Sequence, residues 1–355
     1  MAAGLPDFPW DTLEPAKARA AQHPDGIVDL SIGTPVDPVP GPIRAALAGA
    51  SDSPGYPLTM GTPDLRAAMA DYVRVACGAD GFGVIPSIGS KELIAWLPTL
   101  LGLGFGDTVI IPEVCYPTYE VGARLAGARV VRSDTPPDEP AALVWLNSPG
   151  NPHGRVATAE ELRAWVSWTR SHGAVLASDE CYLSLPWEQT PISVLHPSIS
   201  GGPLDGLLAV HSLSKRSNLA GYRAGLVAGD PALVNELLSV RKHAGMMLPA
   251  PVQAAMAAAL RDTVHVDEQR ARYAARRVAL RQAVEKAGFR IEHSTAGLYL
   301  WLTRDEECWQ TLEWFAERGI LVAPGAFYGP AGQLFVRMAL TATDERVAAA
   351  VARLS

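Results

Sequence analysis

Short apolar runs alternate with amphipathic stretches through the middle of the chain, and this alternation limits the possible folds more than any other feature. Each run is bounded by Gly, Pro, Asp or Asn, which is typical of buried strands, and the stretches between the runs have helical periodicity. Alternating strands and helices form a mostly parallel sheet that is covered on both faces, so the sequence predicts an α/β fold. The expected strands are residues 108–111, 129–131, 142–146, 174–177, 207–210 and 226–228, and the expected helices are residues 90–103, 118–126, 159–171 and 231–243.

A different pattern begins after Pro251. A long helical region, residues 251–287, precedes shorter segments that indicate a smaller α+β unit. Its expected strands are residues 289–292, 298–302, 320–323 and 333–338, and its expected helices are residues 306–318 and 343–353. We therefore expect a large domain at residues 36–245 and a small domain formed by residues 1–35 and 246–355.

Composition excludes several classes of function. The 355 residues are 48% hydrophobic and 19% charged, which is ample for a large core. The net charge of -7 gives no general attraction to nucleic acid or acidic membranes, and no apolar stretch is long enough to cross a bilayer. The N-terminus lacks the pattern of a secretory signal, and the four cysteines have no metal-ligand spacing. We expect a cytoplasmic protein that binds no metal, nucleic acid or membrane.

The strongest chemical signal is the segment 211–225, which directly follows an expected strand. Lys215 stands there between small and hydroxylated residues, and a lysine that forms a Schiff base needs a crowded apolar site that lowers its pKa. Ser212 and Ser214 offer hydroxyls to a phosphate, and Arg223 adds charge-assisted hydrogen bonds. An isolated Ser-x-x-Lys is more often a solvated loop, so this segment needs support from elsewhere in the chain.

A second segment supplies an acidic group at the end of another expected strand. Asp179 follows an apolar run, and a carboxylate there is costly unless it meets a cation. A protonated pyridine nitrogen would be such a cation, and Tyr182, three residues later, would reach a hydroxyl on the same ring. The alternative is an ordinary helix N-cap, a position that favours Asp.

Three weaker signals lie in other segments, and two of them, Asn151 and Tyr116, follow expected strands. Asn151 lies in a turn rich in Pro and Gly and offers its amide to a ligand oxygen. Ser90 and Lys91 open a helix after a small-residue turn, which is a phosphate-binding arrangement. Tyr116 is placed to stack on a planar ring. The same patterns also suit a plain turn, an ordinary helix start and a half-buried core tyrosine.

Taken in order, these segments resemble the fold type I pyridoxal-phosphate enzymes, the class I/II aminotransferases related to aspartate aminotransferase, over essentially the whole chain. The resemblance implies a large domain with a mostly parallel sheet of the seven-stranded type, a smaller α+β domain and pyridoxal 5'-phosphate as cofactor. It also implies a set of cofactor-binding residues with one catalytic lysine, Lys215. The set is Ser90, Lys91, Tyr116, Asn151, Asp179, Tyr182, Ser212, Ser214, Lys215 and Arg223.

The resemblance implies further roles outside that set. Arg337 matches the arginine that binds the substrate α-carboxylate, Gly33 matches a glycine beside the substrate, and Tyr56 matches a tyrosine that reaches the phosphate of the neighbouring subunit. The chain is therefore expected to form a homodimer with shared active sites that acts on amino acids and keto acids. His153 departs from the family, which has Thr in this turn.

Within the family, the chain is most similar to the actinobacterial N-succinyldiaminopimelate aminotransferases. That resemblance implies that glutamate donates an amino group to N-succinyl-2-amino-6-ketopimelate, on the route to diaminopimelate and lysine. The candidate residues for binding the extra negative charge are Lys91, Arg241, Lys242 and His243. The last three are equally typical of a basic helix end in solvent. The sequence is also compatible with an aminotransferase of another amino acid, a pyridoxal-phosphate lyase on the same scaffold, or a non-catalytic sensor domain.

Overall fold

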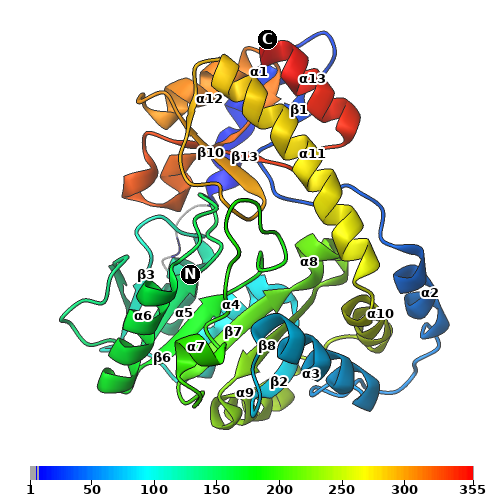
Figure 1. Ribbon diagram of the computed structural model, residues 1–355, viewed down its shortest axis with the longest axis vertical. Coiled ribbons are helices and arrows are strands. Elements are labelled where there is room, and N and C mark those ends of the chain that lie inside the picture. The colour runs from blue at the N-terminus through cyan, green and yellow to red at the C-terminus, as the bar shows by residue number, and fades with distance from the viewer. Residues whose placement is uncertain (1–4, 6–7, 355) are drawn as a thin grey trace.

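The structure, a computed structural model, describes Leu5 and residues 8–354. Residues 1–4 and 6–7 of the expected small domain, and Ser355, lie outside the described residues. The large sheet and its helices form the lower part of the molecule in Figure 1, and the smaller sheets lie above it. None of the helices in the described part is both long enough and apolar enough for a membrane span.

The large sheet has seven strands within the described residues, in the order β2-β8-β7-β6-β5-β3-β4. Strands β3 to β7 are mutually parallel, whereas β8 is antiparallel to both of its neighbours. The bounds are β2 (Gly83–Ile88), β3 (Thr108–Ile111), β4 (Arg129–Arg132), β5 (Leu143–Asn147), β6 (Val175–Asp179), β7 (Leu207–Ser212) and β8 (Ala224–Gly229). The predicted α/β fold with a large, mostly parallel sheet is confirmed.

One strand of this sheet escaped prediction. β2 contains Pro86, and a proline normally argues against a strand because it cannot donate a backbone hydrogen bond. β2 lies at the edge of the sheet and pairs only with β8 there, with Pro86 opposite Leu226. An edge strand has a free side, so the missing donor is tolerated.

Helices cover both faces of the sheet, as alternating side chains along the strands require. Ile110 and Val144 face one core together with α2, α3, α6 and α10, whereas Val109 and Trp145 face the other together with α4, α5 and α9. The bounds of the helices around the sheet are α2 (Gly41–Gly49), α3 (Pro63–Cys77), α4 (Gly89–Leu100), α5 (Thr118–Ala126), α6 (Ala159–His172), α7 (Pro197–Ser200), α8 (Leu213–Arg216), η2 (Ala220–Tyr222), α9 (Pro231–His243) and α10 (Ala250–Arg261).

The upper part contains a four-stranded antiparallel sheet, in the order β12-β13-β10-β9, and the parallel pair β1-β11. The strand bounds are β1 (Val28–Asp29), β9 (Arg290–Ile291), β10 (Tyr299–Thr303), β11 (Ile320–Leu321), β12 (Ala323–Pro324) and β13 (Val336–Ala339). The helix bounds are η1 (Pro9–Leu13), α1 (Glu14–Ala20), α11 (Val264–Lys286), α12 (Cys308–Ala316), η3 (Gly325–Tyr328), η4 (Pro330–Gly332) and α13 (Asp344–Leu354).

Two expectations for this half need correction. The helical region 251–287 is two helices, because the chain leaves α10 at Asp262, whose carboxylate then accepts a hydrogen bond from the Val264 backbone amide at the start of α11. The expected strand 320–323 divides into β11 and β12, which belong to different sheets. Because the segment is divided, β11 pairs with β1 and β12 pairs with β13.

The domain boundaries remain a prediction. α10 packs against α2 and α3, and its buried residues belong to the same core as Ile110 and Val144, on one face of the large sheet. α11, by contrast, packs against α13 and contributes to the upper core. We therefore propose that the second boundary lies after α10 rather than at residue 245.

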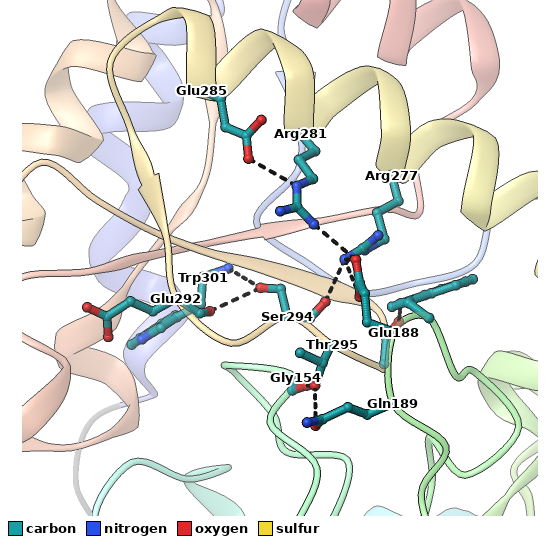
Figure 2. A network of polar contacts seen from close by, with 12 residues as sticks. Gly154, Glu188, Gln189, Arg277, Arg281, Glu285, Glu292, Ser294, Thr295 and Trp301 are labelled. Carbon is teal, nitrogen blue, oxygen red and sulfur yellow. Dashed lines mark hydrogen bonds and ion pairs between the residues drawn. The ribbon is translucent and has the colours of Figure 1, made fainter.

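Polar contacts join α11 to the loops above the large sheet (Figure 2). The Arg277 guanidinium donates to both carboxylate oxygens of Glu188, at 2.7 and 2.8 Å, and to the Ser294 carbonyl at 2.8 Å. The Thr295 hydroxyl donates to the Gln189 side chain at 3.0 Å and lies 3.3 Å from the Gly154 carbonyl. This network holds the turn around Gly154 against the upper part of the molecule.

Candidate active site

The carboxyl ends of β5, β6 and β7 bring three of the predicted segments to one edge of the large sheet. β5 ends at Asn147, four residues before Asn151, β6 ends at Asp179, and β7 ends at Ser212, three residues before Lys215. The Asn147 side chain connects two of these segments. Its amide donates to the Asp179 carbonyl at 2.9 Å, and its oxygen accepts from the Asn151 backbone amide at 2.7 Å.

Asp179 is a buried carboxyl that is held in a fixed orientation. The Tyr119 hydroxyl donates to one of its oxygens at 2.7 Å, and the Cys181 backbone amide donates to the other at 3.1 Å. Burial raises the pKa of Asp179, and these hydrogen bonds oppose that rise. β6 is followed by a turn at residues 181–184 and not by a helix, so Asp179 is not a helix N-cap.

Lys215 lies on the short helix α8, directly after β7. The Ser212 hydroxyl caps this helix by accepting from the Ser214 backbone amide at 3.1 Å, and both serines are buried. The Lys215 ammonium group donates to the Gly33 carbonyl. Burial lowers the pKa of Lys215, and the nearby Arg337 and Arg223 lower it further. These conditions favour the neutral, nucleophilic form of the amine.

An anion cradle forms where α4 begins. Antiparallel pairing of Ile88 with Ala224 places Arg223 beside Gly89, the first residue of α4. The Arg223 guanidinium lies so close that a Cβ atom at Gly89 would be 2.5 Å from it. Ser90 and Lys91 follow Gly89, so free backbone amides, the helix dipole and a guanidinium converge at one point.

Arg337 lies opposite this cradle, on β13 of the upper sheet. Its buried guanidinium donates to the Asn151 side-chain oxygen at 2.9 Å and to the Ser31 carbonyl at 2.6 Å. It also stacks on Tyr299, with 4.0 Å between the guanidinium carbon and the ring centre. The hydroxyls of Tyr299 and Tyr182 are 3.1 Å apart, which brings Tyr182 into the same group.

Gly33 is required by this arrangement. A Cβ atom at that position would lie 2.2 Å from the Tyr299 hydroxyl, so any side chain would displace Tyr299 from Arg337. Tyr116 lies at the side of the site, with its ring centre 5.9 Å from the Lys91 ammonium nitrogen. The structure thus brings together all the predicted cofactor ligands on this chain except Tyr56, and their individual roles remain predictions.

The remaining predicted residues lie elsewhere. Tyr56 is 95% exposed on the loop between α2 and α3. Lys242 and His243 are exposed at the end of α9. Arg241 is only 1% exposed, and its guanidinium donates to the Glu92 carboxylate at 3.1 Å, which favours a structural role over the alternative that it binds substrate. Its charge is already paired within the fold.

Several neighbours of the site were not recognised in the sequence. Tyr119 looks like a core residue of an amphipathic helix, and Tyr299 looks like a core residue of a strand, so neither pattern carries a functional signal. The four cysteines lack metal-ligand spacing, yet the fold places Cys77 Sγ 3.5 Å from His211 Nε2 and Glu180 Oε2 3.6 Å from the same nitrogen. Contacts between residues this distant in sequence leave no local pattern.

The site fits a cofactor that carries a phosphate, a basic ring nitrogen and a carbonyl group. The cradle at Gly89 suits the phosphate, the buried Asp179 suits a protonated ring nitrogen, and the buried Lys215 amine suits the carbonyl carbon. The family model described as aminotransferase class I and II matches residues 25–354. The chain belongs to the class I and II aminotransferases. Its cofactor is pyridoxal phosphate, as in the other members of that family.

Two named relatives are similar over nearly the whole chain. The 4-dedimethylamino-4-oxo-anhydrotetracycline transaminase OxyQ of Streptomyces rimosus is 60% identical over 356 residues, which cover 99% of each protein. The probable aminotransferase Rv1178 of Mycobacterium tuberculosis is also 60% identical, over 100% of this chain and 86% of that protein.

Solved structures of aminotransferases share the fold. The probable N-succinyldiaminopimelate aminotransferase from Thermus thermophilus is 29% identical, with a TM-score of 0.86 over 98% of this chain and 99% of that one. The aminotransferase AspB from Helicobacter pylori is 26% identical, with a TM-score of 0.88 over 98% and 99% of the two chains. The predicted class of enzyme, a transaminase, is confirmed, whereas its substrate remains a proposal.

Proposed function

We propose that this transaminase moves an amino group from glutamate to an acidic keto acid, N-succinyl-2-amino-6-ketopimelate. The observation that carries the proposal is the position of Arg337, buried and oriented by Asn151 in the same site as Lys215. A fixed guanidinium binds a carboxylate through two parallel hydrogen bonds, and a keto acid or amino acid presents that carboxylate next to its reacting carbon. The likeness to the Thermus thermophilus protein supports the narrower choice of acceptor.

Each residue then has a defined task. Arg337 orients the carboxylate of the substrate, and its contacts with Asn151 and Ser31 keep it from rotating. The Lys215 amine, whose pKa is lowered by burial, takes the proton from the substrate Cα and returns one at the end of the reaction. Asp179 would hold the protonated ring nitrogen of the cofactor, and the Tyr119 hydroxyl stabilises the ionised form of this carboxyl. Pyridoxal phosphate supplies the electron-withdrawing ring that makes the Cα proton acidic.

The phosphate contacts hold the cofactor but take no part in proton transfer. Arg223 and the amides at the start of α4 form one positively polarised surface beside Gly89, to which we propose that the hydroxyls of Ser212 and Ser214 contribute. We propose that Tyr56 adds to this surface in the partner subunit of a homodimer, because its exposed side chain is free to extend into a second chain. A cytoplasmic location is part of the same proposal.

A second candidate acceptor is 4-dedimethylamino-4-oxo-anhydrotetracycline. The observation that favours it is the 60% identity to OxyQ over 99% of both chains. This acceptor is a rigid polycyclic ketone without a carboxylate beside its reacting carbon, so it would not use Arg337 as a keto acid does. The two candidate acceptors therefore differ in whether they need Arg337: the keto acid needs it to bind its carboxylate, and the polycyclic ketone does not.

One set of experiments tests both. Single-turnover absorbance spectra of the purified holoenzyme identify the amino donor when each amino acid of a panel, including glutamate, is added. The pyridoxamine form is then mixed with N-succinyl-2-amino-6-ketopimelate, with the tetracycline ketone or with pyruvate. The proposal expects the fastest return of the aldehyde spectrum with the succinylated acceptor, and at least a tenfold loss of that rate in Arg337→Lys. Release of pyruvate and ammonia from a sulfur amino acid would instead indicate a lyase.

A further inference from the structure

Three buried polar groups beside the active site have no hydrogen-bond partner within the described residues: the Arg337 Nε, the Tyr328 hydroxyl and the Trp10 indole nitrogen. Tyr328 is fully buried, and the groups that act electrostatically on its hydroxyl are Arg337, Tyr299 and Tyr116, all of which belong to the site. Buried polar groups are nearly always paired, and leaving one unpaired costs about 1–3 kcal/mol. Arg337, Tyr328 and Trp10 are also neighbours, so that one ligand could bring acceptor atoms to all three donors.

The side chains form a continuous series, which we call the aromatic track: Tyr328, Trp10 and Phe8. The track begins at Arg337, whose guanidinium carbon is 5.1 Å from the Tyr328 ring centre. The ring centres of Tyr328 and Trp10 are 6.4 Å apart, and those of Trp10 and Phe8 are 5.5 Å apart. The track ends at Lys91, whose ammonium nitrogen lies 5.5 Å from the Phe8 ring centre.

The two ends of the aromatic track have different chemistry from its middle. Each end is a cation, Arg337 at one side and Lys91 at the other. The middle offers ring surface on Phe8 and on the partly exposed Trp10, together with the Trp10 N–H and the hydroxyl of the fully buried Tyr328, and the described part of the track carries no carboxylate. A complementary ligand has a carboxylate at each end, with a flat group that bears an acceptor oxygen between them.

We propose that Trp10 and Tyr328 bind the acyl arm of the acceptor, and that Lys91 binds the carboxylate at the end of that arm. This inference rests on the proposed function, and it names the residues that select an N-acylated substrate. A succinyl amide has a planar amide that stacks on aromatic rings, a carbonyl oxygen for a donor and a terminal carboxylate for Lys91. Phe8 is 53% exposed beside Lys91, so part of its ring is free to cover such an arm.

The residues of the aromatic track and Lys91 come from three separate parts of the chain that meet beside the active site. Phe8 and Trp10 come from the chain start and η1, Tyr328 comes from η3, and Lys91 comes from the beginning of α4. Trp10 is held in this group by Phe327, at 5.4 Å between ring centres. The N-terminal segment thus joins the upper sheet to the cofactor side of the large sheet.

The test measures selectivity rather than activity alone. In Tyr328→Phe and in Trp10→Phe an aromatic ring remains, but the hydrogen-bond donor is lost. We measure kcat/KM for N-succinyl-2-amino-6-ketopimelate and for pyruvate, and take the ratio, so that any general loss of activity cancels. One hydrogen bond contributes about 0.5–1.5 kcal/mol, so each variant should lower the ratio about threefold to tenfold.

A matched control comes from the same aromatic group. Trp309 contacts Phe327 at 5.9 Å but lies outside the track, and it is 43% exposed. Trp309→Phe should keep the wild-type ratio. A ratio that falls as much in Trp309→Phe as in Trp10→Phe would mean that the effect is only structural, and would overturn the inference.

A binding measurement gives a readout independent of turnover. 6-(Succinylamino)hexanoate has a carboxylate, an amide and a terminal carboxylate but no reactive amine or ketone, and hexanoate lacks the acyl arm and also has no amine. Calorimetric titration of the wild-type holoenzyme should show tighter binding of the succinylated compound. In the double variant Trp10→Phe and Tyr328→Phe, the ratio of the two dissociation constants should fall about tenfold. An unchanged preference would overturn the inference. A wild-type enzyme that does not use the succinylated acceptor would instead overturn the proposed function.

Discussion

The Tyr119 hydroxyl donates a 2.7 Å hydrogen bond to the Asp179 carboxylate, from a helix that lies 60 residues earlier in the chain. Tyr119 is fully buried and stacks on Trp145, with 5.0 Å between ring centres, so its hydroxyl has little freedom to turn elsewhere. The bond favours the ionised form of Asp179, against the effect of burial. Tyr119 therefore helps to preserve the charge on which the cofactor ring depends.

Removal of this hydroxyl should shift the pH dependence of the enzyme. The hydrogen bond lowers the pKa of Asp179, so in Tyr119→Phe that pKa rises and the carboxylate becomes protonated at a higher pH than in the wild type. The acid limb of the pH profile of kcat/KM should move to higher pH, with a loss of about tenfold near neutral pH from one charge-assisted bond. Tyr72→Phe is the control and should leave the limb in place, because the Tyr72 hydroxyl lies 3.3 Å from His211 Nδ1 and not beside Asp179.

Asp179→Ala should reduce catalysis far more than cofactor retention. The anion cradle beside Gly89 holds the phosphate whether or not Asp179 is present, whereas proton transfer needs a protonated ring nitrogen. We expect kcat/KM to fall about a hundredfold or more, and the dissociation constant of the cofactor to change much less. Dialysis followed by absorbance measures retention. Wild-type turnover in this variant would contradict the assigned role.

Arg241 should contribute to stability and not to specificity. Its guanidinium is 1% exposed and paired with Glu92, so Arg241→Met leaves a carboxylate without its partner. We expect a loss of about 3 kcal/mol in the free energy of unfolding, measured by urea titration, with no change in the ratio of acceptor activities. Lys242→Met, one residue later but exposed, should change stability by less than about 0.5 kcal/mol. Equal stability of both variants would contradict the interpretation.

A shared active site should be detectable by mixing inactive chains. Tyr56 is 95% exposed on its own chain, away from the buried site, so its proposed phosphate contact requires a second subunit. Lys215→Ala and Tyr56→Phe are each expected to be weakly active, and a mixed dimer contains one site with both residues intact. Unfolding and refolding a mixture should restore up to about a quarter of the wild-type activity, whereas each variant refolded alone should not. No recovery would argue against shared sites.

The sequence predicted the residues at strand ends because those positions depend on local pattern. Asp179 and Lys215 each follow an apolar run, and in a parallel sheet the ends of such runs must meet. Arg241 could not be assigned in the same way, because a run of basic residues looks exposed until the fold supplies Glu92 from 149 residues away. Tyr119 was missed for a related reason: its helical pattern is that of a core residue, and only the tertiary structure brings Asp179 to it.

His153 should make the protein less stable in acid. Its ring accepts a hydrogen bond from the Arg155 backbone amide at 3.1 Å and lies 5.6 Å from the ring of His293, across the contact between the large sheet and the upper part of the molecule. Burial lowers the pKa of His153 to about 3, and His293 and Arg155 act in the same direction. Asp134 acts on His293 with the opposite sign.

The sign of the effect follows from proton binding. In the unfolded chain His153 has a pKa of about 6.5, so between about pH 6.5 and pH 3 the unfolded state binds a proton that the native state does not. Its contribution to stability is therefore complete above about pH 6.5 and is lost as the pH falls toward 3.

His153→Asn keeps a side-chain acceptor for Arg155 and removes the titration. The free energy of unfolding, measured in urea from pH 7 to pH 5, should fall less steeply in the variant, by up to about 1.4 kcal/mol per pH unit. His211, whose pKa is also lowered to about 3, titrates equally in both proteins and does not affect the difference. Parallel curves for the two proteins would show that His153 does not set this pH dependence.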